Sequence, residues 1–256
     1  MTESVPDWQL PPGVNRGLWD YLHDQDLAHG CDAGLADNSL LRVDQAFCEQ
    51  HFDRPGRLID LGCGTGRLLL PFARRGWWVL GVDLSAEMLN VAQRKAKAAG
   101  VSVTLLQANL VELACLQNQS FDHAACLFST LGMIQGAEPR RRVLEHAFRL
   151  LRPGGTFVLH VHNRWFNLWD PPGRRWLLRD LWSGPECGDR VMPTHQGVAG
   201  LTLHLFTRWE IVRLLRRVGF RLREVRPISL RNDGRLPWPA WFGGLRAYGY
   251  LIASER

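Results

Sequence analysis

The stretch LIDLGCGTG, Leu58–Gly66, joins an apolar run and an acid to three glycines at alternate positions. Apolar residues that lead into a glycine-rich turn are typical of a buried strand followed by a helix, and the glycines leave the backbone open to a ligand. We expect a strand over 57–61 and a helix from about Arg67 whose free N–H groups point at that ligand. Asp83 lies 17 residues after the last glycine, at the end of the next predicted strand, where a carboxylate can accept both hydroxyls of a ribose. The spacing therefore indicates a ligand that contains a nucleoside.

The glycine spacing argues against a nicotinamide dinucleotide. A dinucleotide-binding turn has the pattern G-x-G-x-x-G, and its third glycine would fall at position 67, where Arg67 stands. Glycine-rich turns also occur in α/β proteins that bind no nucleotide, and in that case Asp60 would only cap the loop. The carboxylate of Asp83 favours the nucleoside interpretation over this purely structural one.

Short apolar runs alternate with longer amphipathic stretches from Arg57 onward, which is typical of strand-helix-strand units in a parallel sheet. Helices are expected over 86–99, 139–151 and 208–218, with a tight turn at 153–155. The predicted fold class is α/β, a seven-stranded, mostly parallel sheet flanked by helices. The predicted strands span 57–61, 77–83, 101–107, 121–127, 156–162, 220–226 and 247–253.

The composition limits where the protein works. The chain has 256 residues, of which 46% are hydrophobic, enough for one core with a small lid. It holds no run of about 18 uncharged apolar residues, and its start, MTESVPDWQLPPG, lacks a basic segment. The six cysteines form no C-x-x-C pair, so reduced thiols are expected. We therefore expect a cytoplasmic protein with no membrane partner and no structural metal.

Several motifs occur in an order that identifies a family. LIDLGCGTG is followed by GVDLS, by LLQANL (Leu105–Leu110), by SFD (Ser120–Asp122) and by LRPGG (Leu151–Gly155). This series resembles the ordered motifs of class I S-adenosylmethionine-dependent methyltransferases, over about 57–253. The resemblance implies a Rossmann-like fold, S-adenosylmethionine as the cofactor, and transfer of its methyl group.

The resemblance also implies roles for individual residues. Asp60 and the glycine loop would hold the methionine half of the cofactor, Asp83 the ribose, and Leu84 would lie against the adenine. The family usually places an aspartate after the third strand to accept the adenine amino group; this chain has Asn109 there, whose amide oxygen can accept the same hydrogen bond. The Cys63 thiol is expected to pack and is assigned no chemistry. The implied cofactor-binding residues are Asp60, Gly62, Cys63, Gly64, Thr65, Gly66, Asp83, Leu84, Asn109, Leu110 and Ser129.

Two histidines alternate on the predicted fifth strand and face the same side of the sheet. His162 comes at the carboxyl end, where ligands bind in this architecture, so it is the first candidate for a catalytic base or a substrate contact. His160 is expected to be buried and hydrogen-bonded to the backbone. An H-x-H pair can also bind a metal, but no carboxylate lies near it in the sequence, so no metal site is predicted.

Two segments outside the shared motifs should decide the substrate. Residues 1–56 are expected to form a helical cap of the same domain, and 57–256 the methyltransferase domain, with a lid inserted at 163–206. The insertion contains RWFNLWDPPGRRWLLRDLW, in which tryptophans that pack on the sheet would form the lid. The predicted substrate contacts in the cap, at the fourth strand and in the insertion are Trp19, Tyr21, Thr130, Asn163 and Trp165.

Three functions remain open from the sequence. A methyltransferase that acts by in-line displacement on a small molecule, including aromatic and quinone-type acceptors, is favoured. An RNA or tRNA methyltransferase is the alternative, because arginines interleaved with tryptophans can neutralise and stack a single strand. The third is a cofactor-binding partner module without activity.

Overall fold

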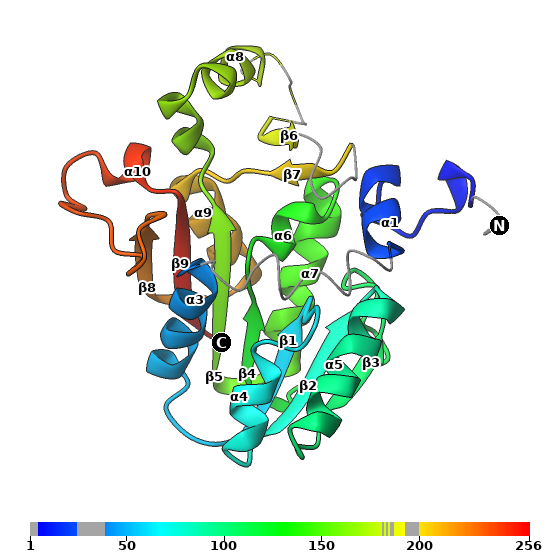
Figure 1. Cartoon of the computed structure of the whole chain (residues 1–256). Helices are drawn as coiled ribbons and strands as arrows, with labels where there is room; N and C mark the ends of the chain where they lie inside the picture. The colour runs from blue at the N-terminus through cyan, green and yellow to red at the C-terminus, as the bar shows by residue number, and fades with distance from the viewer. Residues whose placement is uncertain (1–4, 25–38, 181, 183, 185–186, 193–199) are drawn as a thin grey trace.

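A seven-stranded sheet lies at the centre of the structure, a computed structural model that describes residues 5–24, 39–180, 182, 184, 187–192 and 200–256 (Figure 1). The strand order is β3-β2-β1-β4-β5-β9-β8. The first five strands in this order are parallel, and β9 runs antiparallel to both of its neighbours. The seven strands are β1 (Arg57–Leu61), β2 (Trp78–Asp83), β3 (Thr104–Gln107), β4 (Phe121–Cys126), β5 (Leu151–His162), β8 (Arg221–Ile228) and β9 (Gly249–Glu255). The predicted α/β class and mostly parallel sheet are confirmed.

Helices cover both faces of this sheet, because apolar residues on both faces of the central strands must be removed from water. One face packs against α7 (Ala137–Leu150) and α9 (Arg208–Val218). The other packs against α3 (Ser39–His51), α4 (Leu69–Arg74) and α5 (Ala86–Ala98). The other helices are η1 (Asp7–Gln9), α1 (Arg16–Leu22), α6 (Thr130–Met133), η2 (Arg164–Trp169), α8 (Pro171–Asp180) and α10 (Gly243–Arg246).

Helix boundaries follow the capping residues of the sequence. The Ser85 hydroxyl accepts a hydrogen bond from the backbone N–H of Met88 and begins α5. Thr207 and Glu210 form the reciprocal bonds of a capping box at the start of α9. Helix α7 begins two residues before the predicted start at Pro139, because proline is tolerated anywhere in the first turn, where its missing N–H needs no partner.

Strand β5 differs from the prediction. It begins at Leu151, not at 156, and runs through the Pro153-Gly154-Gly155 segment that was expected to be a tight turn. Leu151 pairs with Phe121, and the register then shifts before His123 pairs with Thr156. The left-handed conformation of Gly154 (φ 78°) makes an irregularity within the strand.

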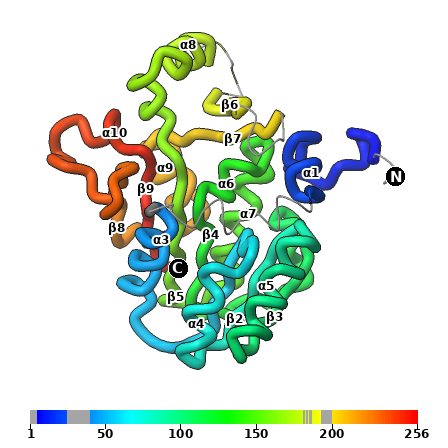
Figure 2. Tube along the Cα trace, viewed as in Figure 1, coloured from blue at the N-terminus to red at the C-terminus, as the bar shows by residue number. Residues whose placement is uncertain are grey.

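Helix α1 lies beside the carboxyl ends of β2 and β3 (Figure 2). The Ser85 hydroxyl donates to the carbonyl oxygen of Leu22 at 2.6 Å, and the amide nitrogen of Asn109 donates to the carbonyl oxygen of Pro12 at 2.9 Å. Leu84 packs against the small apolar cluster that α1 builds around Leu18. Residues 5–22 are thus attached to these strand ends. Of the predicted cap (1–56), residues 1–4 and 25–38 lie outside the described residues.

The inserted segment 163–206 leaves the sheet and returns to the same point. Asn163 and Phe206 are bridge partners, and the N–H of Arg164 donates to the carbonyl oxygen of Phe206. Between them lie η2, α8 and a two-stranded sheet of β6 (Asp189–Val191) and β7 (Thr202–His204), which was not predicted.

A buried polar network fixes this insertion to the domain. Asp189 of β6 accepts hydrogen bonds from Arg140 of α7 and from the imidazole of His204, which also contacts Glu210 of α9. Burial disfavours the charged form of His204, but its hydrogen bonds to the two carboxylates outweigh that effect and raise the pKa of the imidazole. The base of the insertion is therefore part of the folded domain.

Within the described residues, no helix is both long enough and apolar enough to cross a bilayer. The five cysteines in those residues form no disulfide; Cys31 lies outside them.

Candidate active site

The glycine loop follows β1 at the carboxyl edge of the sheet. The N–H groups of Gly62 and Cys63 both donate to the carbonyl oxygen of Val82, which joins the loop to the end of β2. Gly62, Gly64 and Gly66 all have positive φ angles, of 85°, 50° and 77°, a conformation that residues with a side chain rarely adopt. The sequence therefore specifies a tight turn at this position.

The glycines differ in what surrounds them. A Cβ atom on Gly62 would lie 2.4 Å from Cγ2 of Thr130, so packing alone requires glycine there. A Cβ atom on Gly64 would meet no atom within 4 Å. The backbone at Gly64 faces open space, which a ligand can occupy against the loop.

Asp83 is buried beside this open space and holds the loop in place. Its Oδ2 accepts the N–H of Gly64 at 2.8 Å, and its Oδ1 accepts the N–H of Ser85 at 2.9 Å. Burial raises the pKa of the carboxyl, and these N–H groups oppose the rise. Each carboxylate oxygen can accept a further bond, so Asp83 can bind a pair of hydroxyls while it keeps the loop in place.

Asp60 is a second buried carboxylate next to the loop. Burial raises the pKa of its carboxyl to about 7, the charge of Asp83 adds to the rise, and the Arg67 guanidinium opposes it. Two buried carboxylates that disfavour each other's ionisation create a site that a cationic ligand would stabilise.

The adenine end of the predicted site is more constrained than the sequence suggested. The side-chain oxygen of Asn109 already accepts the N–H of Val111 at 3.1 Å, and its nitrogen binds Pro12. One lone pair of that oxygen remains for an adenine amino group. The Leu110 side chain packs in the hydrophobic core, so this residue can face a ligand only through its backbone.

The Cys63 side chain is also part of the core, in line with the packing role expected for it. Burial raises the pKa of its thiol well above the usual value, which makes it unreactive.

The turn after β4 brings Ser129 and Thr130 to the same edge of the sheet. Phe128 and Ser129 both adopt left-handed φ angles, of 50° and 62°, an unusual conformation for residues with side chains and one that is often found at functional sites. The Ser129 hydroxyl accepts the backbone N–H of His162 at 3.3 Å, and the Thr130 hydroxyl donates to the carbonyl oxygen of Leu127 at 2.8 Å. Ser129 thereby joins the ends of β4 and β5.

His162 lies at the end of β5 among aromatic rings. Its ring centroid is 4.7 Å from that of Tyr248, 5.4 Å from that of His160 and 6.1 Å from that of Phe128. Its Nε2 atom is buried and has no hydrogen-bond partner among the described residues. Burial, together with the charge of His160, lowers the pKa of His162 to about 3. The imidazole is therefore neutral at physiological pH.

His160 is buried, as expected, but its partner is a carboxylate and not the backbone. Its Nδ1 lies 3.0 Å from Oδ2 of Asp44, a residue of α3. The described residues contain no group of three or more histidine, cysteine or acidic side chains that could hold a metal ion.

The structure also brings residues to the site that were not predicted. The Arg67 guanidinium carbon lies 5.7 Å from the centroid of the Phe128 ring, and its Nη1 atom is buried without a hydrogen-bond partner in the described part of the chain. Arg67 stood out in the sequence only because it broke the dinucleotide pattern. Phe128, Tyr248 and Asp44 gave no signal at all, because each comes from a different part of the chain.

Other predicted substrate residues have structural partners. The Asn163 side chain donates to the carbonyl oxygens of Gly244 and Ala247, both at 2.8 Å, and its oxygen accepts the N–H of Trp165. Trp19 stacks on His23 with 4.0 Å between ring centroids. Asn163 thus connects the start of the insertion to the loop before β9.

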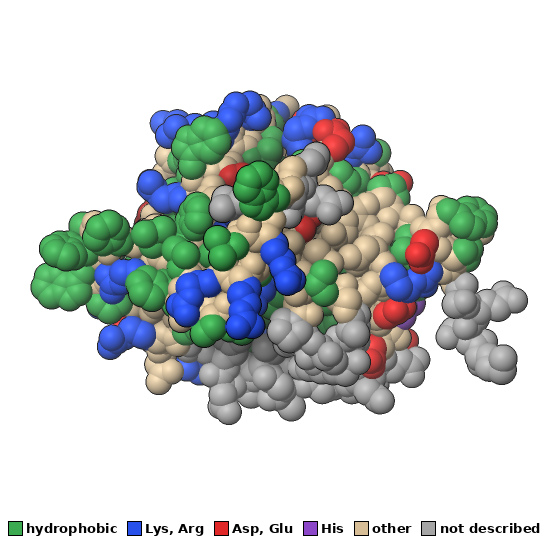
Figure 3. All heavy atoms as spheres, turned by 90° about the horizontal axis from the view of Figure 1, so that it is seen from above, with side chains coloured by type: hydrophobic (Ala, Val, Ile, Leu, Met, Phe, Trp, Pro, Cys, Tyr) green, Lys and Arg blue, Asp and Glu red, His purple; other side chains and the backbone are tan. Residues whose placement is uncertain are grey.

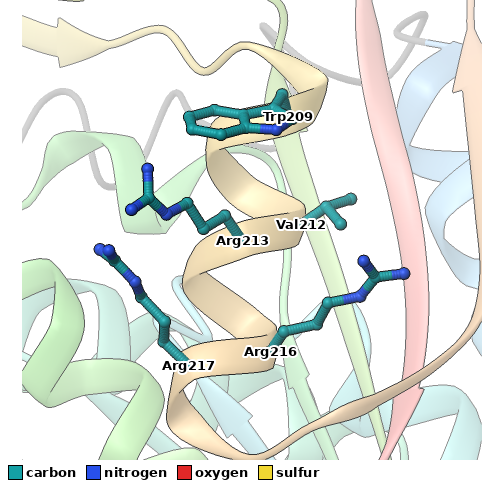
Figure 4. Close-up of a pocket in the computed structure, with 5 residues that line it drawn as sticks. All are labelled: Trp209, Val212, Arg213, Arg216 and Arg217. Atoms are coloured by element: carbon teal, nitrogen blue, oxygen red, sulfur yellow. The ribbon is translucent and has the colours of Figure 1, made fainter.

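A shallow hollow of about 400 Å³ lies on the outer face of α9, apart from this site (Figure 4). Trp209 and Arg213 stack across it, with 4.8 Å from the guanidinium carbon to the ring centroid. None of the predicted site residues lines this hollow. Its lining residues are Trp209, Val212, Arg213, Arg216 and Arg217.

The sheet is parallel except for β9, which is inserted antiparallel between β5 and β8, and a glycine loop and an acid stand at the ends of β1 and β2. This arrangement is the Rossmann-like fold that class I methyltransferases share. Residues 58–155 match the family model described as a methyltransferase domain. The chain belongs to the class I S-adenosylmethionine-dependent methyltransferases, whose cofactor is S-adenosylmethionine.

Individual relatives agree with this assignment. The ubiquinone biosynthesis O-methyltransferase of Hahella chejuensis is 33% identical over 162 residues, which are 60% of this chain and 66% of that protein. The chain spans about half the length of other curated relatives that it matches.

Two solved structures share the fold. The S-adenosylmethionine-dependent methyltransferase of Methanosarcina mazei superimposes with a TM-score of 0.68 at 23% identity, over 82% of this chain and 96% of that one. The 1,6-didemethyltoxoflavin N1-methyltransferase of Burkholderia thailandensis, solved with bound 1,6-didemethyltoxoflavin and S-adenosylhomocysteine, has a TM-score of 0.61 at 22% identity, over 90% and 84% of the two chains.

Proposed function

We propose that this protein transfers a methyl group from S-adenosylmethionine to a small-molecule acceptor. The observation that carries the proposal is the open space at Gly64 beside the Asp83 carboxylate. These two features fit the cofactor, because the loop can approach it without a side chain and Asp83 can accept its ribose hydroxyls. When bound, S-adenosylmethionine supplies a methyl group on a positively charged sulfur for in-line displacement.

The acceptor half of the site favours a planar, partly apolar molecule. Phe128, Tyr248 and His162 surround the end of β5, next to Ser129. A pKa near 3 makes His162 a weak proton acceptor, so we propose that its free Nε2 orients the acceptor through a hydrogen bond and does not carry the proton away. A relative that is named as an O-methyltransferase of ubiquinone biosynthesis supports an aromatic or quinone-type acceptor.

The two other functions have less support. An RNA acceptor would need an open basic groove beside the methyl group, whereas the residues around His162 are mainly aromatic. A module without activity would not require a buried histidine nitrogen to remain unpaired at the acceptor end.

Cofactor binding and methyl transfer are tested together. Calorimetry with S-adenosylmethionine should show one site per chain, and incubation of the protein with labelled cofactor and a fractionated cell extract should place the label in the small-molecule fraction. Label in the RNA fraction would identify the alternative acceptor. Cofactor binding with no labelled fraction would support the inactive module.

Asp83→Ala should weaken cofactor binding between about tenfold and 150-fold, because charge-assisted hydrogen bonds to the ribose contribute about 1.5–3 kcal/mol. Asp122→Ala is the matched control, since Asp122 also accepts a backbone N–H, that of Arg57, but does so at the amino end of the sheet. Calorimetry should show an unchanged affinity for the control. Equal affinities for both variants would remove Asp83 from the site.

The affinity for S-adenosylmethionine should fall about tenfold from pH 8 to pH 6. Above a pKa of about 7 the Asp60 carboxylate is ionised and attracts the cationic cofactor; below it, the bound proton must be lost before the charges can pair. Asp60→Asn should remove the part of the pH dependence that comes from Asp60. The titration of the cofactor's own amino group affects both proteins alike, so the difference between the pH profiles of the original protein and the variant reports Asp60 alone. Parallel profiles for the two proteins would contradict the assignment.

A further inference from the structure

Residues 229–247 lie between β8 and β9 and precede Tyr248; they form a projection that the proposed function does not use. Three of their aromatic side chains are largely exposed: Trp238 at 78%, Trp241 at 72% and Phe242 at 69%. Trp169 of η2, exposed at 60%, adjoins them through a hydrogen bond from its indole nitrogen to the carbonyl oxygen of Leu245. We call these four side chains the aromatic lobe. Figure 3 shows hydrophobic side chains gathered on the projection at the left, with arginines beside them.

The backbone holds the rings of the aromatic lobe outward. Trp238 and Phe242 adopt left-handed φ angles of 52° and 47°, which are unfavourable for aromatic residues. The Arg246 guanidinium donates to the carbonyl oxygens of Trp241 at 3.1 Å and Trp238 at 3.4 Å. Asn163 attaches the same segment to the end of β5. The exposure therefore accompanies a strained backbone held by hydrogen bonds, and strained residues of this kind cluster at functional sites.

The surroundings of the aromatic lobe are positively charged. Segments 164–180 and 229–248 together contain seven arginines and three aspartates. Arg164 and Asp180 are buried against each other, so this pair offers no net charge to the surface and six arginines and two aspartates remain. Large exposed apolar groups beside cations mark an interaction site for a partner that is apolar and anionic at once.

We propose that the aromatic lobe docks this protein on the surface of an anionic lipid bilayer. Tryptophan is favoured at the boundary between headgroups and acyl chains because its ring is apolar and its N–H is polar, and arginines attract anionic headgroups. A second copy of the chain would bring the same positive charge against itself. A single RNA strand would need a basic groove with rings along its floor, whereas these rings project from a loop.

The docking is peripheral and needs no spanning segment. The sequence predicted no membrane partner because it contains no long apolar run, and a surface contact through four side chains leaves no such signal. Because Asn163 attaches the lobe to the strand that carries His162, docking would bring the acceptor end of the sheet toward the bilayer. The inference does not depend on methyl transfer.

Co-sedimentation of the whole protein with vesicles tests the inference. Vesicles of equal parts phosphatidylcholine and phosphatidylglycerol should bind the protein at least tenfold more tightly than vesicles of phosphatidylcholine alone. The triple variant Trp238→Asn, Trp241→Ser, Phe242→Asn should lose at least tenfold in affinity, with asparagine chosen because it tolerates the left-handed conformation. Tryptophan fluorescence should shift to the blue with the anionic vesicles, and this shift should be much smaller for the variant.

The matched control is Trp8→Ser with Trp209→Ser, which removes two tryptophans of similar exposure to those of the lobe, at 80% and 68%, from other parts of the surface. Its vesicle affinity should stay within twofold of the original. Both variants should keep the melting temperature and the calorimetric cofactor affinity of the original protein. A loss of vesicle binding then results from the changed surface and not from unfolding. The proposal is overturned if the original protein stays in the supernatant, if the triple variant binds like the original, or if the two vesicle types bind equally. Two further results would assign the lobe to another partner and also overturn the proposal. One is a dimer in sedimentation velocity that only the triple variant loses, and the other is binding of single-stranded RNA that only the triple variant loses.

Discussion

Replacement of residues 170–187 by a short glycine-serine linker, in an Arg164→Met background, should lower methyl transfer at least 100-fold. The cofactor affinity should remain within about tenfold, or 1.4 kcal/mol. The reason is the division of the sheet: the proposed cofactor site lies at the ends of β1, β2 and β3, whereas the insertion leaves and rejoins at the end of β5. A lid there would exclude water from the reacting methyl group and shape the acceptor pocket.

The boundaries of this replacement follow from the buried network at the base of the insertion. A longer excision, of 166–200, would remove Asp189 and leave the buried Arg140 and His204 without their shared carboxylate, which destabilises the fold by about 3–5 kcal/mol. The shorter excision keeps Asp189. It removes Asp180, the partner of Arg164, and methionine at 164 avoids an unpaired buried charge.

Two measurements decide the outcome. Transfer of labelled methyl reports activity, and calorimetry reports the cofactor. The excised protein could still melt cooperatively and yet lose cofactor binding as completely as it loses activity. That result would contradict the proposal that cofactor and acceptor bind to different halves of the sheet. Full activity would place the acceptor beneath α1, and Trp19 and Tyr21 would be the next residues to change.

Gly64→Val should weaken binding of S-adenosylmethionine at least 100-fold. The valine side chain would enter the open space beside the loop, and its bulk would meet the ligand at the point of closest backbone approach. Because the φ angle of Gly64 is +50°, the substitution also strains the turn, so binding must be compared with stability.

Gly76→Val provides the matched control. Gly76 has a φ angle of +79° and open space where a Cβ would lie, but it stands in the turn between α4 and β2, not in the glycine loop. The two variants should lose similar amounts of thermal stability, and calorimetry should detect a loss of cofactor affinity only in Gly64→Val. Retained binding in Gly64→Val would mean that the loop faces away from the ligand.

The cofactor half of the site was predicted from the sequence because its information is local. The left-handed turns at Gly62, Gly64 and Gly66 depend on residue type at each position, and the place of Asp83 follows from the length of one strand-helix-strand unit. The same holds for the seven strands, for the Ser85 cap of α5 and for the capping box of α9, which adjoining residues encode. Among the strands, the sequence did not predict the irregular start of β5, because the extension of β5 to Leu151 depends on pairing with β4.

The acceptor half was decided only by the tertiary structure. His162 was a candidate by its place on a strand, but its low pKa and its unpaired Nε2 result from burial beside Phe128, Tyr248 and His160. Asn163 was expected to contact substrate, and the structure adds a role that the sequence did not indicate: its side chain holds the loop before β9.

The exposure of the aromatic rings in residues 229–248 was also not predictable from the sequence. A tryptophan in a sequence normally predicts burial, and Trp238, Trp241 and Phe242 carry no pattern that says otherwise. Residue types and their spacing determined where the chain turns and which backbone can approach a cofactor. Burial, charge neutralisation and exposure are set by neighbours that lie far away along the chain, so only the folded arrangement of β4, β5, α3 and the loop before β9 decided what surrounds the acceptor.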